Sequence, residues 1–213
     1  MSSSFAGLYL YFVSPNLKGL IYVQDAMIFW MTQFLVAAFF LVEIYLLAVK
    51  RCRDSKHQSD RGSLRLVWIL ITGGCVVGFL LAPKVSFLGW PDSSAIVLLA
   101  DLLLTAGIAL RIWSIVHLGR FFTVNVAIQE GQRVIQDGPY RFVRHPSYSG
   151  SMLALVGLAC LTFNWLGFAV ITGCSFLAYT LRISVEEKVL LKSLGEEYRQ
   201  YAERTKRLVP GIY

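Results

Sequence analysis

Long apolar runs decide what this chain of 213 residues can fold into. A helix rising about 1.5 Å per residue needs about 20 residues to cross the ~30 Å hydrocarbon core of a membrane. The sequence offers five such runs, at about 26–49, 64–82, 94–116, 151–163 and 165–181. The fourth run is short and only Asn164 separates it from the fifth, so these two are predicted to form a tight helical hairpin. The pattern predicts an all-α integral membrane bundle with about five transmembrane helices.

Composition excludes several classes of protein. Hydrophobic residues make up 56% of the chain and charged residues only 15%, which lies outside the usual range of soluble domains. The start of the chain lacks a basic region followed by a small-residue cleavage site, so we expect no signal peptide. Residues 5–13 are an interfacial candidate, and the sequence leaves open whether 5–23 adds a further membrane helix. The four cysteines have no paired spacing and no His/Cys cluster occurs, so we expect buried thiols and no metal. Neither a P-loop nor a GxGxxG or GxSxG motif is present.

The basic residues indicate an orientation in the membrane. The net charge is +7, yet the cations follow the ends of the apolar runs instead of lining one face, so no nucleic-acid partner is expected. Only Lys18 and Lys84 fall on one side of the predicted membrane, whereas the other Lys and Arg residues gather on the opposite side. The positive-inside rule makes that basic side cytosolic. The two largest polar segments, about 117–150 and 182–213, should therefore meet at the cytosolic surface.

One polar segment, GPYRFVRHPSYSG at 138–150, interrupts the apolar second half. Gly138 and Pro139 signal a turn, and Pro146 forces His145 out of helical geometry, so a helix should begin there. The free backbone N–H groups of a helix start can receive an anionic or polar ligand. Such a segment can equally be a juxtamembrane anchor, because Tyr prefers the interface and Arg and His contact lipid headgroups. The spacing alone leaves both interpretations open.

A second polar constellation opens the C-terminal segment. Arg182 and Glu186 lie one helical turn apart and share a face, with Glu187 beside them. An exposed pair of this kind contributes only about 0.3–0.5 kcal/mol, and the order Arg before Glu is the less favourable one. Ionisable groups at the mouth of a membrane helix are functional candidates, here for a zwitterion or for two ligands of opposite charge. A plain salt bridge is the alternative.

The remaining C-terminal residues predict an amphipathic helix. Leu190, Leu194, Tyr198 and Tyr201 form one stripe, and Pro210 and Gly211 should end the helix. The stripe suits a helix lying on the membrane surface or one that faces a site. Two small-residue patterns predict close helix packing. These are the GxxxG of 74–78 and the face made by Gly150, Ala154 and Gly157, which could also admit a cofactor.

The C-terminal half resembles the isoprenylcysteine carboxyl methyltransferase family and its wider relatives, which include phospholipid N-methyltransferases. The resemblance rests on GPYRFVRHPSYSG, EEKVLLKSLGEEYRQY and RLVPG in that order, preceded by the Arg-x-Trp of Arg111 and Trp113. It implies a membrane enzyme that takes a methyl group from S-adenosyl-L-methionine in a cytosolic pocket built from the C-terminal half. It also implies a division into N-terminal transmembrane helices at 1–110 and a catalytic region at 111–213, within one membrane domain.

The resemblance also implies which residues make the site. The cofactor-binding positions map to Gln132, Arg133, Val134, Ile135, Tyr140, His145, Pro146, Ser147 and Tyr148, and a carboxylate for the methionine ammonium to Glu186 or Glu187. Arg182 maps to the residue that faces substrate, and we expect it to be both catalytic and substrate-binding. No metal is implied. Arg141 and Arg144 are left as lipid or structural contacts.

The chemistry expected from this resemblance is carboxyl methylation of an isoprenylcysteine-like acceptor entering from the bilayer. A carboxylate is already ionised at neutral pH, so it needs no general base, and none is apparent in the sequence. The alternatives are a phospholipid or other small-lipid N- or O-methyltransferase, an NADPH-dependent membrane sterol or enone reductase, and a non-enzymatic protein whose basic loops bind anionic lipid. The membrane would be the inner membrane of a prokaryote or the endoplasmic reticulum of a eukaryote.

Overall fold

The computed structural model describes residues 19–49, 62–91, 93–124 and 128–213. Five α-helices dominate these residues, and no β-strand occurs among them. They are α2 (Gly19–Val49), α3 (Gly62–Leu81), α4 (Ser94–Leu118), α5 (Pro146–Cys160) and α6 (Trp165–Arg204). The short 3₁₀ helices η3 (Ala82–Lys84), η4 (Ser86–Leu88), η5 (Gly119–Phe121) and η6 (Gly138–Arg141) lie in the connections. The all-α prediction is confirmed.

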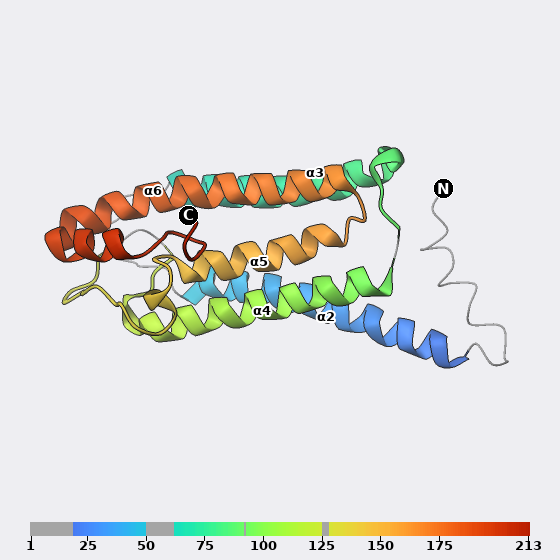
Figure 1. The fold of residues 1–213 in the computed structure, drawn as a ribbon, viewed down its shortest axis with the longest axis horizontal. Helices are drawn as coiled ribbons and strands as arrows, with labels where there is room; N and C mark the ends of the chain where they lie inside the picture. The colour runs from blue at the N-terminus through green and yellow to red at the C-terminus, as the bar shows by residue number, and fades with distance from the viewer. Residues whose placement is uncertain (1–18, 50–61, 92, 125–127) are drawn as a thin grey trace.

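The helices run roughly along one long axis and pack side by side (Figure 1). α4 packs mainly against α5, α3 against α6, and α2 against α4. The link between α5 and α6 spans only four residues, and Asn164 caps α6 by accepting hydrogen bonds from the N–H groups of Leu166 and Gly167. The predicted hairpin of the last two apolar runs is therefore present.

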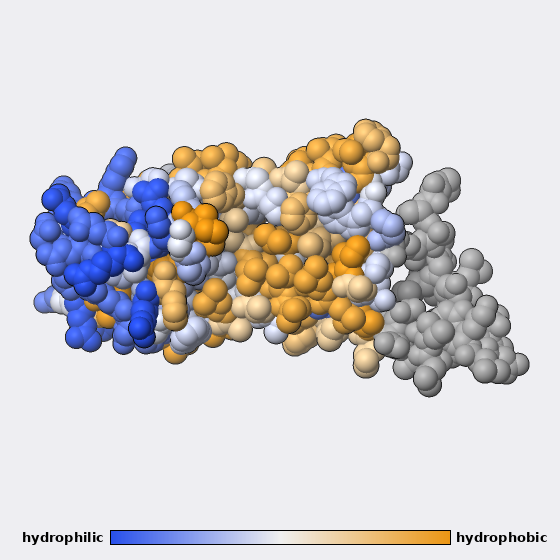
Figure 2. Space-filling view, viewed as in Figure 1, coloured by the Kyte–Doolittle hydropathy of each residue, from blue (hydrophilic) through white to orange (hydrophobic). Residues whose placement is uncertain are grey.

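The bundle is that of a multi-pass integral membrane protein. Ala26–Ala48, Gly62–Lys84, Ser94–Phe121 and α6 are long and apolar enough to cross a membrane. α5 has 15 residues, about 22 Å of helix, which is too short to cross alone. Apolar side chains cover the middle of the molecule, while hydrophilic residues gather at the end where α6 finishes (Figure 2). The interfacial candidate at 5–13 and most of the first basic link lie outside the described residues.

Glycines let α4 and α5 approach to backbone contact. A Cβ added to Gly107 would lie 2.5 Å from the backbone nitrogen of Ala154, and one added to Gly150 would lie 2.6 Å from the nitrogen of Arg111. The small-residue face of α5 therefore receives a neighbouring helix. Gly74 and Gly78 similarly meet α6, so both predicted packing patterns are found.

Two acids, the partly buried Glu43 and the buried Asp101, pair with polar groups on other helices. Glu43 of α2 makes a bidentate ion pair with Arg111 of α4, at 2.5 Å to Nε and 2.6 Å to Nη2. Asp101 of α4 accepts a hydrogen bond from Thr32 of α2 over 2.9 Å. Because an unpaired charge is costly in hydrocarbon, these contacts fix how α2 lies against α4.

α6 continues well beyond its apolar part, which runs from Trp165 to Leu181. Gly195 interrupts the helix with a φ of 57°, a left-handed conformation that glycine adopts at little cost. The helix ends at Arg204, earlier than the expected stop at Pro210 and Gly211. The last residues then fold back against the segment before α5, where Val143 pairs with Lys206.

Candidate active site

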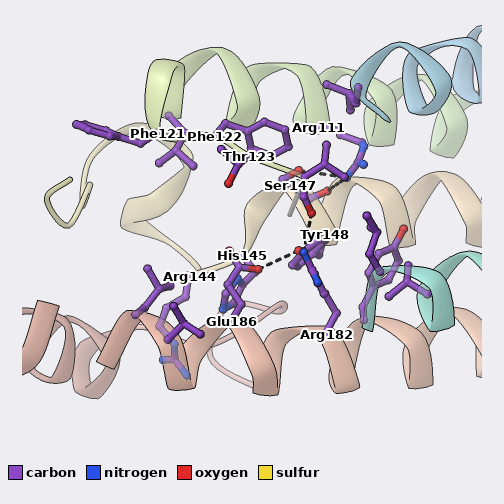
Figure 3. Close-up of a pocket in the computed structure, with 18 of the residues that line it drawn as sticks. Arg111, Phe121, Phe122, Thr123, Arg144, His145, Ser147, Tyr148, Arg182 and Glu186 are labelled. Carbon is purple, nitrogen blue, oxygen red and sulfur yellow. Dashed lines mark hydrogen bonds between the residues drawn. The ribbon is translucent and has the colours of Figure 1, made fainter. Parts of the chain in front are cut away.

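A large pocket opens where the polar ends of the helices meet. It encloses about 1510 Å³ of space not filled by atoms, counting its open mouth. Its polar part lies between the loop after α4, the start of α5 and the portion of α6 beyond Leu181 (Figure 3). Its apolar part is lined by α2 and α3, through Phe39, Phe40, Leu46, Leu47, Leu64, Val67, Trp68 and Ile71. The N-terminal helices thus share the pocket with the C-terminal half.

The segment 138–146 has the local structure that its prolines and glycine predict. Gly138, at a φ of 55°, starts the turn η6, and Pro146 is the first residue of α5 after the non-helical His145. The N–H of Arg144 donates to the carbonyl of Lys206 over 2.8 Å, and that of His145 to the carbonyl of Arg207 over 3.0 Å. The chain end therefore holds this loop against the pocket.

Glu187 sits outside the pocket, at the centre of a basic cluster. Its carboxylate accepts from Arg144 Nε at 2.8 Å and from Arg207 Nε at 3.0 Å, and lies 3.4 Å from His145 Nε2. Burial alone raises the pKa of Glu187, but hydrogen bonds from His145, Arg144 and Arg207 outweigh it and hold that pKa at about 2. Glu187 joins α6, the loop before α5 and the chain end.

Glu186 faces the opposite way, into the pocket. Its Oε2 accepts a hydrogen bond from the Tyr148 hydroxyl over 2.9 Å. The Tyr148 ring stacks between those of His145, at 5.7 Å, and Tyr179, at 5.2 Å. The stacked rings of His145, Tyr148 and Tyr179 thus hold the Glu186 carboxylate in one orientation. A side chain that binds a charged ligand group needs such a fixed orientation.

Arg182 points from α6 across the pocket (Figure 3). Its side chain is buried, and its guanidinium donates to Ser63 Oγ over 2.5 Å and to the Val124 carbonyl over 2.6 Å. The planar fork thereby connects α3, α6 and the loop after α4 at the boundary between the polar and apolar parts. A cation fixed there can hold an acidic group whose hydrophobic portion lies between α2 and α3.

The ion pair of Arg111 and Glu43 forms the inner wall of the pocket. Besides its bonds to Glu43, Arg111 Nη1 donates to the carbonyl and to Oγ of Ser147, both over 3.1 Å. Ser151 Oγ lies 3.3 Å from Glu43 and accepts from the Tyr179 hydroxyl over 2.7 Å. This network orients the first turn of α5 from inside the bundle.

The remaining predicted residues divide into two groups. Gln132, Arg133, Val134 and Ile135 line the pocket as one extended segment, and Tyr140, His145, Ser147 and Tyr148 line it from the loop and α5. Pro146 is buried but does not line the pocket, and neither does Glu187. The structure therefore brings together all the predicted cofactor positions except these two, with Arg182 among them.

A histidine outside the predicted set supports Tyr140. His117 Nε2 lies 3.0 Å from Asp137 Oδ1, and its ring stacks on Tyr140 at 6.3 Å. The hydrogen bond from His117 lowers the pKa of Asp137. The Tyr140 hydroxyl in turn donates to the carbonyl of Ser114 over 3.2 Å.

Sequence reasoning did not assign several pocket-lining residues to the site. Glu43 and Arg111 come from helices far apart in the sequence. Each is a charged residue within an apolar run, and this feature could have marked them as candidates for the site. The stripe of Leu190, Leu194, Tyr198 and Tyr201 lines the pocket, so its apolar side faces the site and not a membrane surface.

Comparisons with known proteins agree with this arrangement. Residues 98–192 match the model of the isoprenylcysteine carboxyl methyltransferase family. A probable protein-S-isoprenylcysteine O-methyltransferase of Oryza sativa subsp. indica is 32% identical over 108 residues, 50% of this chain and 56% of that protein. Protein-S-isoprenylcysteine O-methyltransferase B of Arabidopsis thaliana is 33% identical over 111 residues, 50% of this chain and 55% of that protein. The chain thus covers little more than half the length of these relatives.

Two further similarities add to this. Methanethiol S-methyltransferase 1 of Bradyrhizobium diazoefficiens is 38% identical over 71 residues, 33% of this chain and 24% of that protein. Among solved structures, the eukaryotic intramembrane Ras methyltransferase, an isoprenylcysteine carboxyl methyltransferase, superposes with a TM-score of 0.62 and 22% identity, over 97% of this chain and 71% of the other. That likeness shows a shared fold. Over residues 98–192, this chain is similar to the isoprenylcysteine carboxyl methyltransferase family.

Proposed function

We propose that the protein is a membrane-embedded methyltransferase that uses S-adenosyl-L-methionine and esterifies the carboxylate of an isoprenylcysteine-like acceptor. The observation that carries this proposal is the pocket itself. It joins a polar chamber, holding Glu186 and Arg182, to an apolar chamber between α2 and α3. A methyl donor with charged groups and an acceptor with a long hydrocarbon tail need these two environments side by side.

The polar chamber fits the donor. Glu186, held by Tyr148, can accept the ammonium of the methionine part, and the segment Gln132–Ile135 can lie along the nucleoside. When bound, the donor supplies a methyl group on a positively charged sulfur. Tyr140, His145, Ser147 and Tyr148 form the wall on the α5 side. Glu187 and Pro146 hold that wall in place from behind.

The apolar chamber fits the tail of a lipid. Leu46, Val67 and Ile71 line it, and so does Phe40, which is 37% exposed. A tail that comes from the bilayer is already out of water, so this lining receives it by van der Waals packing and not by a further hydrophobic gain. The substrate would enter from the bilayer with its acidic end toward Arg182.

The protein's contribution to the reaction is alignment and electrostatics. Arg182 would hold the acceptor carboxylate so that one of its oxygens lies in line with the bond that breaks. That oxygen would take the methyl group, and the donor would leave as a neutral thioether that keeps the electron pair of the broken carbon–sulfur bond. No proton moves, so no base is required. The buried walls exclude water, which strengthens the attraction between Arg182 and the carboxylate.

We place the polar end of the bundle at the cytosol. The hydrophilic end in Figure 2 contains the charged part of α6, and most Lys and Arg residues among the described residues belong to this side. The positive-inside rule supports this orientation. Residues 111–213 would then supply most of the cofactor chamber, and the helices before residue 111 the lipid chamber.

Methylation of a thiol is the second candidate function, because a methanethiol S-methyltransferase is among the relatives. A thiol of ordinary pKa near 8.5 must lose its proton before it attacks. The only carboxylates that line the pocket in the described residues are Glu43 and Glu186, and Arg111 already holds Glu43 as its counter-ion. The apolar chamber also exceeds what a one-carbon thiol requires. Both points favour the carboxyl acceptor.

One assay separates these functions. The purified protein in lipid nanodiscs is incubated with methyl-labelled S-adenosyl-L-methionine and, separately, with a farnesylated cysteine derivative, methanethiol and phosphatidylethanolamine. Carboxyl methylation predicts label in the farnesylcysteine product that base treatment releases as methanol. Base-stable label in methanethiol or the phospholipid, with none on farnesylcysteine, would refute the proposed acceptor.

A further inference from the structure

Tyr198 carries the one tyrosine hydroxyl of the pocket that has no hydrogen-bond partner among the described residues. Its side chain is buried, with 4% exposed, and it lines the pocket from the C-terminal part of α6. The other four pocket tyrosines all use their hydroxyls within the protein. Tyr140 donates to Ser114, Tyr148 to Glu186, Tyr179 to Ser151 and Tyr201 to the carbonyl of Tyr140.

An unpaired hydroxyl at this position costs the protein stability. A buried polar group without a partner loses its hydrogen bonds to water and gains none in return. Phenylalanine would fill the same space, make the same ring contact with Tyr201 at 6.0 Å, and avoid that cost. Such a group is explained when a ligand supplies the missing partner.

The surroundings of Tyr198 indicate which part of a ligand it meets. Leu190 and Leu194 line the pocket from α6, and Val134 and Ile135 line it from the segment after α4. The N–H of Val134 is 3.4 Å from Glu197 Oε1, which holds that segment against α6. The neighbours of Tyr198 from these two segments are therefore mainly apolar, while the carboxylates of Glu187 and Glu186 are near enough to act on its phenol electrostatically. This part of the pocket suits a flat heteroaromatic ring better than a charged amino-acid end.

The phenol acts there as a donor. Burial, together with the nearby carboxylates of Glu187 and Glu186, raises the pKa of Tyr198, so its proton stays in place at physiological pH. A neutral O–H pairs with a ring nitrogen that has a free lone pair. An adenine ring attached through nitrogen 9 offers three such nitrogens, at positions 1, 3 and 7.

We propose that the Tyr198 hydroxyl donates a hydrogen bond to a ring nitrogen of the adenine of the methyl donor. This inference rests on the proposed function and adds a residue that neither the sequence motifs nor the family match assigns. The kink at Gly195 contributes to this arrangement, because it changes the direction of the last turns of α6, which carry Tyr198. Glu186 and Tyr198 would then bind opposite ends of one cofactor.

The test measures affinity for S-adenosylhomocysteine by isothermal titration and unfolding temperature without ligand. Tyr198→Phe should bind S-adenosylhomocysteine about tenfold more weakly while its ligand-free unfolding temperature stays equal or rises. Tyr201→Phe gives the contrast, because its hydroxyl donates over 2.7 Å within the protein, so its ligand-free unfolding temperature should fall. Tyr45→Phe, at a side chain that is 59% exposed, should change neither quantity.

A second comparison identifies the atom on the ligand. Analogues of S-adenosylhomocysteine that carry carbon in place of nitrogen 1, 3 or 7 are titrated against wild type and Tyr198→Phe. One analogue should bind wild type about tenfold more weakly than S-adenosylhomocysteine does. The same analogue and S-adenosylhomocysteine should bind Tyr198→Phe with equal affinity. Equal parent affinities for wild type and Tyr198→Phe, or the same analogue losses in both proteins, would overturn the inference. Absence of binding by wild type would instead refute the proposed function on which it rests.

Discussion

The hydroxyl of Tyr148 donates to Oε2 of Glu186 over 2.9 Å, and this bond joins α5 to α6 inside the pocket. The two residues belong to separate polar segments of the sequence, each of which taken alone suits a membrane anchor or a surface salt bridge. Their contact makes a membrane-surface role for either segment a poor explanation. It also gives Glu186 the fixed orientation that an ammonium-binding carboxylate needs.

Tyr148→Phe removes this bond while keeping the stacked rings. A hydrogen bond to a charged group contributes about 1.5–3 kcal/mol, so we expect at least about tenfold weaker binding of S-adenosylhomocysteine. Isothermal titration measures the effect, and Tyr45→Phe on the lipid-facing surface of α2 is the matched control. Unchanged affinity would show that Glu186 is not oriented by Tyr148.

Arg182→Lys keeps the charge and removes the planar fork. A lysine ammonium cannot donate to Ser63 Oγ and to the Val124 carbonyl in the geometry that the guanidinium provides. We expect kcat/KM for the carboxyl acceptor to fall by about 100-fold, while affinity for S-adenosylhomocysteine changes little. Arg199→Lys makes the same change at an exposed position of α6 and should leave both unchanged. Equal losses of affinity and turnover in Arg182→Lys would place Arg182 in the cofactor site.

Glu187 gives a pH dependence of stability with a definite sign. Its pKa is about 2 in the folded protein against 4.5 ordinarily, so it stabilises the fold above about pH 4.5 and loses that contribution as the pH falls toward 2. Glu187→Gln should therefore unfold at a lower temperature than wild type at pH 7. The difference between the two proteins should shrink progressively from about pH 5 to pH 3. Thermal unfolding in detergent checks this.

The control for that series is Glu203→Gln, at an exposed position near the end of α6. Its unfolding temperature should follow that of wild type at every pH. A difference between Glu187→Gln and wild type that stays constant from pH 7 to pH 3 would contradict the role assigned to the basic cluster.

Two glycine substitutions should have opposite effects. The Cβ of Gly107→Ala would meet the backbone of Ala154 at 2.5 Å, and we expect a loss of about 1–3 kcal/mol from overpacking α4 against α5. Gly173→Ala meets nothing within 4 Å in the interior of α6, and should gain about 0.4–1 kcal/mol. Unfolding temperatures of the two variants test this. Similar values for both would mean that the contact between α4 and α5 can relax.

Much of the fold follows from local sequence physics. The length of each apolar run predicts a helix, Pro146 predicts the start of α5, and Asn164 predicts the turn before α6. The clustering of Gln132–Ile135, the His145 segment, Arg182 and Glu186 around one pocket agrees with the family resemblance, which treats separate motifs as one site.

The rest depends on contacts between distant residues. Glu186 and Glu187 are neighbours in sequence, and only the surrounding fold shows that one faces the pocket and the other faces Arg144, His145 and Arg207. The pairing of Glu43 with Arg111 likewise joins two helices that no local pattern connects. The helix end at Arg204 lies before Pro210, because the chain turns there to pair with the loop preceding α5.

The most direct test of the account is binding of the product of the methyl donor. The wild-type protein, purified in detergent or nanodiscs, is titrated with S-adenosylhomocysteine and separately with NADPH. The proposed function predicts saturable binding of S-adenosylhomocysteine at one site per chain and no binding of NADPH. Binding of NADPH alone would point to a reductase, and binding of neither compound would contradict a cofactor pocket at this site.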